Sequence, residues 1–239
     1  MNTENFKLIM AIIAVWFTTT ATITAQGSKT MYVMKGGEVI YQSAVSDIDS
    51  VIFYKPVPMD GVLINGVVWA KYNVDAPGTF AANPESYGMF YQWSRPKGWP
   101  SSDVVTDWDP TCPEDNTWEE ANDPSPVGWC LPTRDDILKL ADTDKVTQAW
   151  VKENNVWCRK YTDNNTGNFI LLPAAGIRYF TDGSNRLQGG PFDPYLGYYW
   201  GSESDDLRFA SGFDFDSTET TIMDYYDRRY GFTIRCVAK

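Results

Sequence analysis

The chain has 239 residues, of which 31 are acidic and 20 basic, so its formal net charge is −11, and it contains no histidine. The excess of carboxylates argues against nucleic acid as a partner, because phosphates would be repelled. The absence of histidine excludes a Ser-His-Asp triad, a Cys-His pair and a His-ligated metal.

The N-terminal segment, residues 1–25, has the pattern of a secretory signal peptide. Lys7 is followed by ten apolar residues, 8–17, and then by small and polar residues as far as Ala25. Such a pattern is typical of a cleaved signal, and its apolar core is too short to span a bilayer as a helix. We therefore expect an extracytoplasmic mature chain, secreted or on the outer cell surface, whose only membrane contact is the signal before cleavage. A retained membrane anchor is the alternative, and no cysteine near Ala25 offers a site for a lipid.

Residues 26–60 predict a small β module followed by a linker. Residues 31–35 and 38–42 flank a Gly36-Gly37 turn in the pattern of a hairpin, and residues 51–55 (VIFYK) form a third expected strand. Three short strands cannot build a core alone, so the module leans on a neighbour or acts as a spacer. Residues 56–61 (PVPMDG) break the pattern as a linker.

The main domain, residues 61–239, begins with a hairpin signal. Two apolar runs flank Asn65-Gly66, a dipeptide typical of a type I′ turn. Residues 73–128 contain eight prolines and therefore predict loops between short aromatic patches.

Two helices are expected in this domain. The first begins at Thr133, whose hydroxyl can cap the first turn, and Asp136 takes the place of the usual Glu of a capping box. The second covers residues 144–153 and buries Val146, Ala149 and Trp150. Strands are expected at residues 168–172, 176–180, 198–201, 208–215 and 230–237.

All the cysteines lie in the expected mature chain, at Cys112, Cys130, Cys158 and Cys236. An even number in an exported protein suggests two disulfides, with three possible connectivities between which spacing does not choose. No CxxC pair occurs, which disfavours a zinc site or a thioredoxin-like centre.

Six sequence patches occur in a recognisable order: INGVVWAKYNV (64–74), YGMFYQWS (87–94), GWCLPT (128–133), FILLPAAGIRY (169–179), YYWGSES (198–204) and YGFTIRCVAK (230–239). Together they resemble the Fibrobacter succinogenes major paralogous domain, a family common in exported proteins of Bacteroidetes. The preceding GGEVIYQSAVSDIDSVIF (36–53) resembles a short β segment often found upstream in such proteins.

This resemblance implies an α+β fold of the C-type-lectin-like kind, with short twisted antiparallel sheets, two helices and long loops. The fold is related to the formylglycine-generating sulfatase-modifying proteins, in which a similar LPT-plus-helix segment and terminal GF-x-x-R strand correspond to residues 131–133 and 231–235. The family has no established catalytic activity, and its members resemble surface, adhesion or pilus-associated modules.

The resemblance also implies a disulfide pattern. The family sequence CP-x-GW-R-LPT and its terminal RCV map one pair to Cys112 and Cys236, although a long insert here separates Cys112 from Gly128. Cys130 stands where the family has arginine, which leaves Cys130 and Cys158 as an additional pair. The expected disulfides are therefore Cys112–Cys236 and Cys130–Cys158.

Catalysis of the kinds known for related folds does not fit these residues. Formylglycine-generating catalysis needs two reactive cysteines close together near the C-terminus, where only Cys236 lies, and iron-dependent relatives need histidine ligands. A paired-carboxylate glycosidase is an alternative, because Asp and Glu are plentiful, but no pattern marks an acid and a nucleophile. We expect no catalytic residues and no enzyme.

Calcium is the one cofactor that the composition admits. Hard cations take several carboxylate and carbonyl oxygens, and Asp205 and Asp206 in the acidic C-terminal third are weak candidates. Calcium-binding lectins use EPN or QPD with WND, which residues 192–194 (FDP) and 200–202 (WGS) echo only loosely. The alternating FDFD of residues 213–216 instead predicts a half-buried strand, so we expect no cofactor.

Aromatic side chains on loops are the candidates for ligand binding, because sugars stack on Trp and Tyr beside polar groups. Trp69, Trp93, Trp129 and Trp200 fall in the family patches and are expected in the core. The candidates lie instead in the polar loop around residues 99–108 and in the 189–198 loop. They are Trp99, Trp108, Asp193, Tyr195 and Tyr198, and local packing is the alternative for each.

We therefore expect a non-catalytic recognition or adhesion module at or outside the cell surface, which binds a glycan or a surface protein. A structural or pilus-associated subunit without a small ligand is the main alternative. A calcium-dependent lectin or a carbohydrate-active enzyme is a more remote one.

Overall fold

The computed structural model describes residues 29–49, 51, 57–102, 104–114, 117–186, 195–204 and 206–239. The expected signal peptide, most of the expected strand at 51–55, and the candidate residues Asp193 and Asp205 lie outside these ranges. The chain divides into two compact units, Met1–Pro56 and Val57–Lys239. The division falls at the start of the linker predicted over residues 56–61.

The smaller unit contains the predicted hairpin. Strands β1 (Thr30–Lys35) and β2 (Glu38–Ala44) pair antiparallel, and Gly36 and Gly37 form the turn with φ of 61° and 90°. A short 3-10 helix, η1 (Val45–Asp47), follows. Several large apolar side chains of the hairpin are exposed: Tyr32, Val33, Val39, Ile40 and Tyr41.

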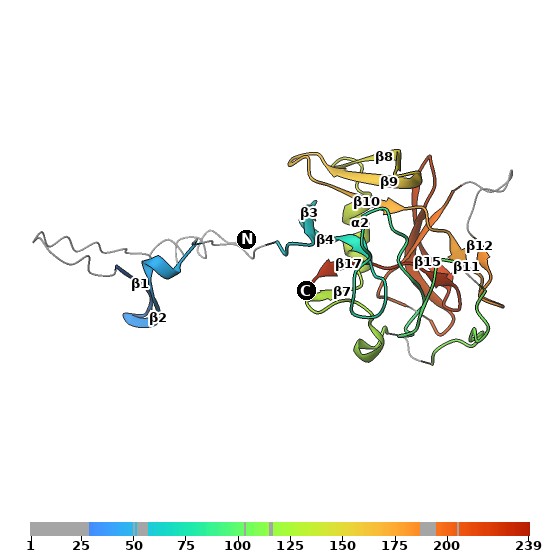
Figure 1. The fold of residues 1–239 in the computed structure, drawn as a ribbon, viewed down its shortest axis with the longest axis horizontal. Coiled ribbons are helices and arrows are strands. Elements are labelled where there is room, and N and C mark those ends of the chain that lie inside the picture. The colour runs from blue at the N-terminus through green and yellow to red at the C-terminus, as the bar shows by residue number, and fades with distance from the viewer. Residues whose placement is uncertain are drawn as a thin grey trace, which may run out of the picture. The chain divides into compact units, whose positions relative to one another are not determined.

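The larger unit is built from four small antiparallel sheets (Figure 1). The strands of the first sheet, in spatial order, are β3 (Gly61–Ile64), β4 (Val67–Asn73), β17 (Arg235–Ala238) and β7 (Trp129–Cys130), and those of the second are β12 (Asn185–Arg186), β11 (Ile177–Arg178), β16 (Gly231–Phe232), β5 (Phe90–Gln92) and β6 (Gly98–Trp99). The third sheet contains β10 (Phe169–Pro173), β9 (Val156–Asp163) and β8 (Val146–Glu153). The fourth contains β13 (Gly197–Trp200), β14 (Phe209–Phe215) and β15 (Thr220–Asp227). A second 3-10 helix, η2 (Glu120–Asn122), lies in the loop before β7.

The expected α+β class is wrong, because the structure is mostly β, with 42% strand and 7% helix among the residues that it describes. These residues contain a single α-helix, α2 (Arg134–Ala141). Most of the second helix expected at 144–153 is instead a strand, β8 (Val146–Glu153), which pairs with β9 over its whole length. The β-branched and aromatic residues of this segment favour a strand, and pairing with β9 satisfies its backbone, which apolar spacing alone does not reveal.

The Asn-Gly turn and the first helix were predicted correctly. Asn65 and Gly66 have φ of 44° and 80° between β3 and β4. At the start of α2, the Thr133 hydroxyl accepts from the Asp136 amide at 3.2 Å, and the Asp136 carboxylate accepts from the Thr133 amide at 3.0 Å. This reciprocal pair is the predicted capping box.

Replacing Thr133 with Ala should lower the free energy of unfolding by about 1 kcal/mol, because the Asp136 amide loses its acceptor at the start of α2. Urea unfolding followed by circular dichroism measures the change. Thr133→Ser, which keeps the hydroxyl, is the matched control. Equal stabilities of the Ala and Ser variants would contradict this role of the hydroxyl.

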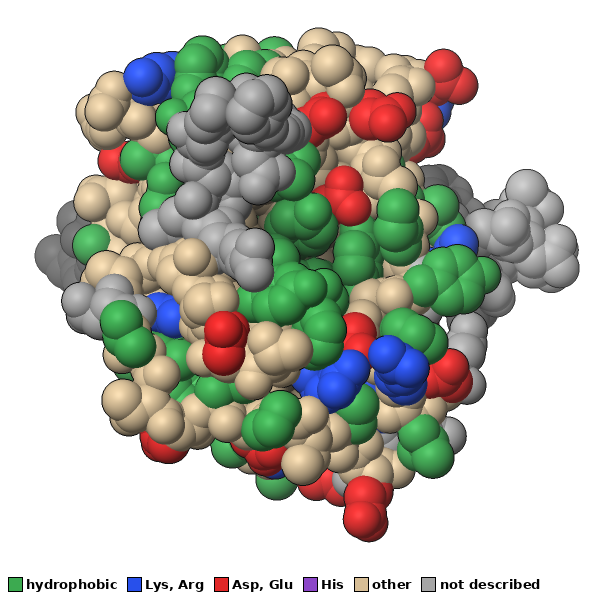
Figure 2. Space-filling view, turned by 90° about the vertical axis from the view of Figure 1, so that its right-hand side faces the viewer, with side chains coloured by type: hydrophobic (Ala, Val, Ile, Leu, Met, Phe, Trp, Pro, Cys, Tyr) green, Lys and Arg blue, Asp and Glu red, His purple; other side chains and the backbone are tan. Residues whose placement is uncertain are grey.

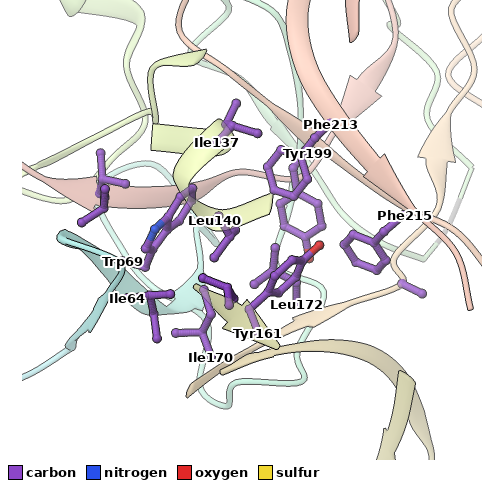
Figure 3. Packing of buried hydrophobic residues seen from close by; sticks show 14 residues of the cluster. Ile64, Trp69, Ile137, Leu140, Tyr161, Ile170, Leu172, Tyr199, Phe213 and Phe215 are labelled. Atoms are coloured by element: carbon purple, nitrogen blue, oxygen red, sulfur yellow. The ribbon is translucent and has the colours of Figure 1, made fainter. Parts of the chain in front are cut away.

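Two main apolar clusters lie on opposite faces of the β3–β4–β17–β7 sheet, because successive side chains of a strand point to opposite faces. Trp69 and Val237 belong to the first cluster, and their neighbours Ala70 and Cys236 to the second. In the first cluster, side chains from α2 and from strands of three sheets converge (Figure 3). As predicted, the tryptophans of the family-like patches are buried: Trp69, Trp93, Trp129 and Trp200.

The described part of the chain contains no helix long and apolar enough to span a bilayer.

Candidate functional site

An open pocket of about 540 Å3 lies where the loop after β4 meets the tip of the β8–β9 hairpin. Ser101, which follows β6, completes the walls. The lining residues are Asp75, Ala81, Ala82, Glu85, Ser86, Tyr87, Gly88, Ser101, Asn154 and Val156. Most of these side chains carry hydrogen-bonding groups, so the walls suit a polar ligand.

The loop wall is shaped by its close approach to the end of β4. The Met89 amide donates to the Val74 carbonyl at 3.0 Å, and the Asn73 side chain donates to the Tyr87 carbonyl at 2.9 Å. Gly88 lies between these bonds with a left-handed φ of 68°, and a Cβ there would lie 2.2 Å from the Val74 carbonyl oxygen. Glycine is therefore required at position 88 for the loop to follow this course.

The opposite wall is the turn of the β8–β9 hairpin. Asn154 and Asn155 have left-handed φ of 44° and 68°, which asparagine tolerates better than other residues that carry a Cβ. Asn154 Nδ2 donates to Glu85 Oε1 at 2.7 Å. This single side-chain bond ties the hairpin tip to the loop and fixes the two walls against each other.

Aromatic side chains pack along the β8–β9 hairpin, where Trp157 lies on the face opposite to its neighbour Val156, a lining residue of the pocket. The Trp150 and Trp157 rings lie parallel, with centroids 5.6 Å apart and an interplanar angle of 12°, and the Tyr195 ring follows 6.2 Å from Trp157. Tyr195 is 41% exposed. Burial, and after it nearby Cys158 and Tyr195, raise the pKa of the pocket residue Tyr87. Tyr87 thus stays protonated near neutral pH, and Tyr195 lies close enough to the pocket wall to act on it.

A buried arginine supports the loop from behind. Arg235 is fully buried, and its guanidinium donates to the Asn73 side chain and to backbone carbonyls of β4, the 81–88 loop and β10. Among the described residues no carboxylate is paired with it, and burial lowers its pKa below the ordinary value for arginine. The guanidinium therefore joins three segments of chain but presents no donor to the pocket.

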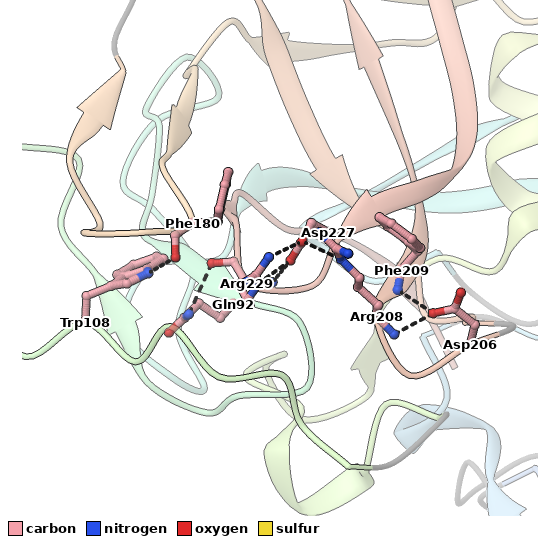
Figure 4. Close-up of polar contacts among 8 residues, drawn as sticks. All are labelled: Gln92, Trp108, Phe180, Asp206, Arg208, Phe209, Asp227 and Arg229. Atoms are coloured by element: carbon pink, nitrogen blue, oxygen red, sulfur yellow. Dashed lines mark hydrogen bonds and ion pairs between the residues drawn. The ribbon is translucent and has the colours of Figure 1, made fainter.

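The predicted candidates Trp99 and Trp108 are structural in this arrangement. Trp99 is only 5% exposed, which fits the alternative of local packing; it belongs to a small cluster that also contacts Tyr87. Trp108 lies 5.3 Å from Trp99 by ring centroids, and its Nε1 donates to the Phe180 carbonyl at 3.1 Å (Figure 4). The aromatic residues of this polar loop turn inward because burying their large apolar rings lowers the free energy of the folded chain.

The candidates of the second loop differ among themselves. Tyr195 is exposed and lies close to the pocket residue Tyr87, whereas Tyr198 is half-buried and packs against Phe232 at 5.1 Å and Tyr226 at 6.1 Å. Asp193 lies outside the described residues. Of the four candidates that the structure describes, Tyr195 therefore combines an exposed ring with a position near the pocket wall.

A group of arginines next to Trp108 is balanced by acidic side chains. The Asp227 carboxylate accepts from Arg229 at 2.6 and 2.8 Å and from Arg208 at 3.2 Å (Figure 4). Burial is the largest single effect on the pKa of Asp227, and it raises the pKa. Hydrogen bonds from these arginines together outweigh burial, so the pKa of Asp227 lies below its ordinary value. Figure 2 shows Lys and Arg side chains in a small group below a central apolar area, with carboxylates both within that face and at its margin. Because Asp227 pairs with both Arg208 and Arg229, we assign these three residues a structural role.

The calcium candidates do not form a site among the described residues, which contain no cluster of three or more potential metal ligands. Asp206 closes its own turn instead, because its carboxylate accepts from the Arg208 and Phe209 amides. These backbone hydrogen bonds lower the pKa of Asp206. Asp205 lies outside the described residues.

The structure contains neither expected disulfide, and its cysteines are free thiols: Cys112, Cys130, Cys158 and Cys236. Cys236 is fully buried and donates to the Ser125 hydroxyl at 3.1 Å, whereas Cys112 is half-exposed and lies close to Asp227 and the arginines. Cys130 and Cys158 lie in different sheets, on β7 and β9. Neither pair that the resemblance implies is bonded in the structure.

Several residues of the pocket were not anticipated from the sequence, among them Glu85, Tyr87 and Asn154. The Asn154-Asn155 pair between two β-prone runs is a hairpin signal that could have located the tip. Nothing in the sequence indicates that this tip meets Glu85, which is 69 residues away along the chain.

No protein-family model, no curated protein and no solved structure matches this chain. Membership of the family that the sequence resembles therefore stays a prediction, and the function is argued from the site.

Proposed function

We propose that the larger unit is a non-catalytic recognition module that binds a saccharide in the pocket between the 81–88 loop and the β8–β9 hairpin. The observation that carries the proposal is a pocket lined by hydroxyl, amide and carboxylate groups, with the exposed Tyr195 ring close enough to its wall to act on Tyr87. The predicted signal peptide supports a place of action outside the cytoplasm, at the cell surface or beyond it.

The two kinds of surface suit the two faces of a sugar. Ser86, Ser101 and Asn154 can exchange hydrogen bonds with ring hydroxyls, and the exposed Tyr195 ring offers an apolar surface to the C–H face. The Trp157 ring packs against Tyr195 in a tilted arrangement, with centroids 6.2 Å apart. A ring held by a neighbour loses less conformational freedom on binding than a free one.

A glycan array on residues 26–239, with calcium and again with a chelator, tests the proposal. We expect binding that survives chelation and weakens at least tenfold, about 1.4 kcal/mol, in Tyr195→Ala and in Trp157→Ala. The matched control is Tyr225→Ala, because Tyr225 is 77% exposed and lies on β15, away from the pocket lining.

Binding that is unchanged in both pocket variants would contradict the assignment of this site. Binding lost on chelation would support a metal-dependent lectin instead. No binding at all would favour the second candidate, a structural or pilus-associated subunit, for which the exposed apolar side chains of the β1–β2 hairpin are the supporting observation.

A further inference from the structure

We propose that the pocket selects cationic saccharides, whose rings carry a protonated primary amine, over their neutral N-acetylated counterparts. This inference rests on the proposed function and adds the chemical class of the ligand. It starts from the charges of the lining, which contains the carboxylates Asp75 and Glu85 and no lysine or arginine.

The two carboxylates have no cationic partner. No ion pair joins either of them to a lysine or arginine among the described residues. Glu85 accepts from the neutral amide of Asn154 at 2.7 Å. The backbone of Asp75 is held in place, since its amide donates to the Thr79 carbonyl at 3.0 Å and its carbonyl accepts from the Tyr91 hydroxyl. The lining therefore presents two carboxylates without a counter-ion, and Asn154 holds the one of Glu85.

Two cations on segments that border the pocket are engaged elsewhere. Arg235, behind the loop, is fully buried and gives its guanidinium donors to protein oxygens. The Lys152 ammonium lies 5.4 Å from the Trp157 ring centroid, on the aromatic stack and outside the lining. Neither side chain supplies the donor that an anionic sugar would require in the pocket.

The charge of the whole chain acts in the same direction. A formal net charge of −11 repels uronic acids and sulfated sugars and attracts ammonium groups. Because such steering is screened by salt while close contacts are screened less, selectivity that arises inside the pocket should persist at moderate ionic strength.

Two tetrasaccharides that differ only at the amino group, the β-1,4-linked tetramer of glucosamine and its fully N-acetylated form, test the proposal by calorimetry on residues 26–239. The measurements are made at pH 5.5, where the sugar amines are protonated, in 150 mM salt. We expect the amino form to bind at least tenfold more tightly. Asp75→Asn and Glu85→Gln should each reduce this preference, since both remove a charge but keep the shape of the side chain. Glu85→Gln also keeps an oxygen that can accept the hydrogen bond from Asn154.

Glu120→Gln is the control, because it removes the same charge at an exposed site, 3.6 Å from Lys239. Equal affinities for the two tetramers, with binding still lost in Tyr195→Ala, would overturn the charge selectivity and leave the saccharide site intact. If Glu120→Gln reduces the preference as much as Glu85→Gln does, the selectivity comes from overall charge, and this result would overturn the pocket's role. Failure of both tetramers and of every arrayed glycan to bind would overturn the site itself.

Discussion

Replacing Arg235 with Met should lower the free energy of unfolding by about 3–5 kcal/mol, one of the two largest losses that we expect from a single substitution in this chain. The substitution removes every donor from a fully buried group of acceptors, which includes the carbonyls of Ala70, Lys71 and Leu171 at 2.8–3.1 Å. A buried acceptor left without a donor costs about 1–3 kcal/mol, and relief from burying a cation offsets part of the sum.

Urea unfolding monitored by tryptophan fluorescence measures this loss. The control is Arg208→Met, since the Arg208 side chain is 62% exposed and paired to Asp227, and exposed pairs contribute about 1 kcal/mol or less. If Arg235→Met does not fold, Arg235→Lys replaces it, because lysine keeps the charge but cannot reach all the acceptors. A loss below 1 kcal/mol in either variant would show that water or rearrangement satisfies these carbonyls.

Replacing Gly88 with Ala should cost about 3–4 kcal/mol and deform the pocket. A left-handed φ costs an alanine about 1–2 kcal/mol, and forcing its Cβ away from the Val74 carbonyl oxygen, 2.2 Å distant, adds an overpacking cost of about 1–3 kcal/mol. The chain contains a matched control in Gly78, whose φ is 82° but whose Cβ would meet nothing within 4 Å.

The difference between Gly88→Ala and Gly78→Ala in urea unfolding therefore isolates the steric contact from the cost of the backbone angle. We expect a difference of about 2 kcal/mol, accompanied by loss of saccharide binding in Gly88→Ala alone. Equal stabilities of the two variants would mean that the loop moves away from β4 at no cost in free energy. The hydrogen bonds between the loop and β4 would then not hold the pocket wall in place.

Local turn chemistry allowed much of the strand pattern to be predicted. The Gly36-Gly37 and Asn65-Gly66 turns mark hairpins because left-handed dipeptides leave the chain few other paths. The helix expected at 144–153 failed because apolar residues spaced like those of Val146 and Trp150 suit a helix or a half-buried strand equally. Pairing with β9 decided between them, and that contact is a property of the folded chain.

The candidate site was less accessible to prediction than the fold. Tyr195 was anticipated because it lies in a loop rich in Gly and Pro, but Glu85 and Asn154 become neighbours only after the hairpin meets the loop. Whether Trp99 binds or packs locally was left open, because its loop has no periodicity and nothing in the sequence shows which way the ring points. The disulfides, inferred from the family pattern rather than from this chain, are not present in the structure.

The place of β17 has a consequence for the order of folding. This strand lies between β4 and β7, and its Arg235 binds a carbonyl 165 residues earlier in the chain. Contacts so distant along the chain form slowly, because a long loop must close before these contacts can stabilise the folded chain. During synthesis β4 emerges well before β17 and keeps an open edge, which is exposed to stray strand pairing until β17 arrives. The larger unit therefore cannot complete its central sheet until Arg235 has left the ribosome, and a chain translocated unfolded would close only after its final strand had crossed.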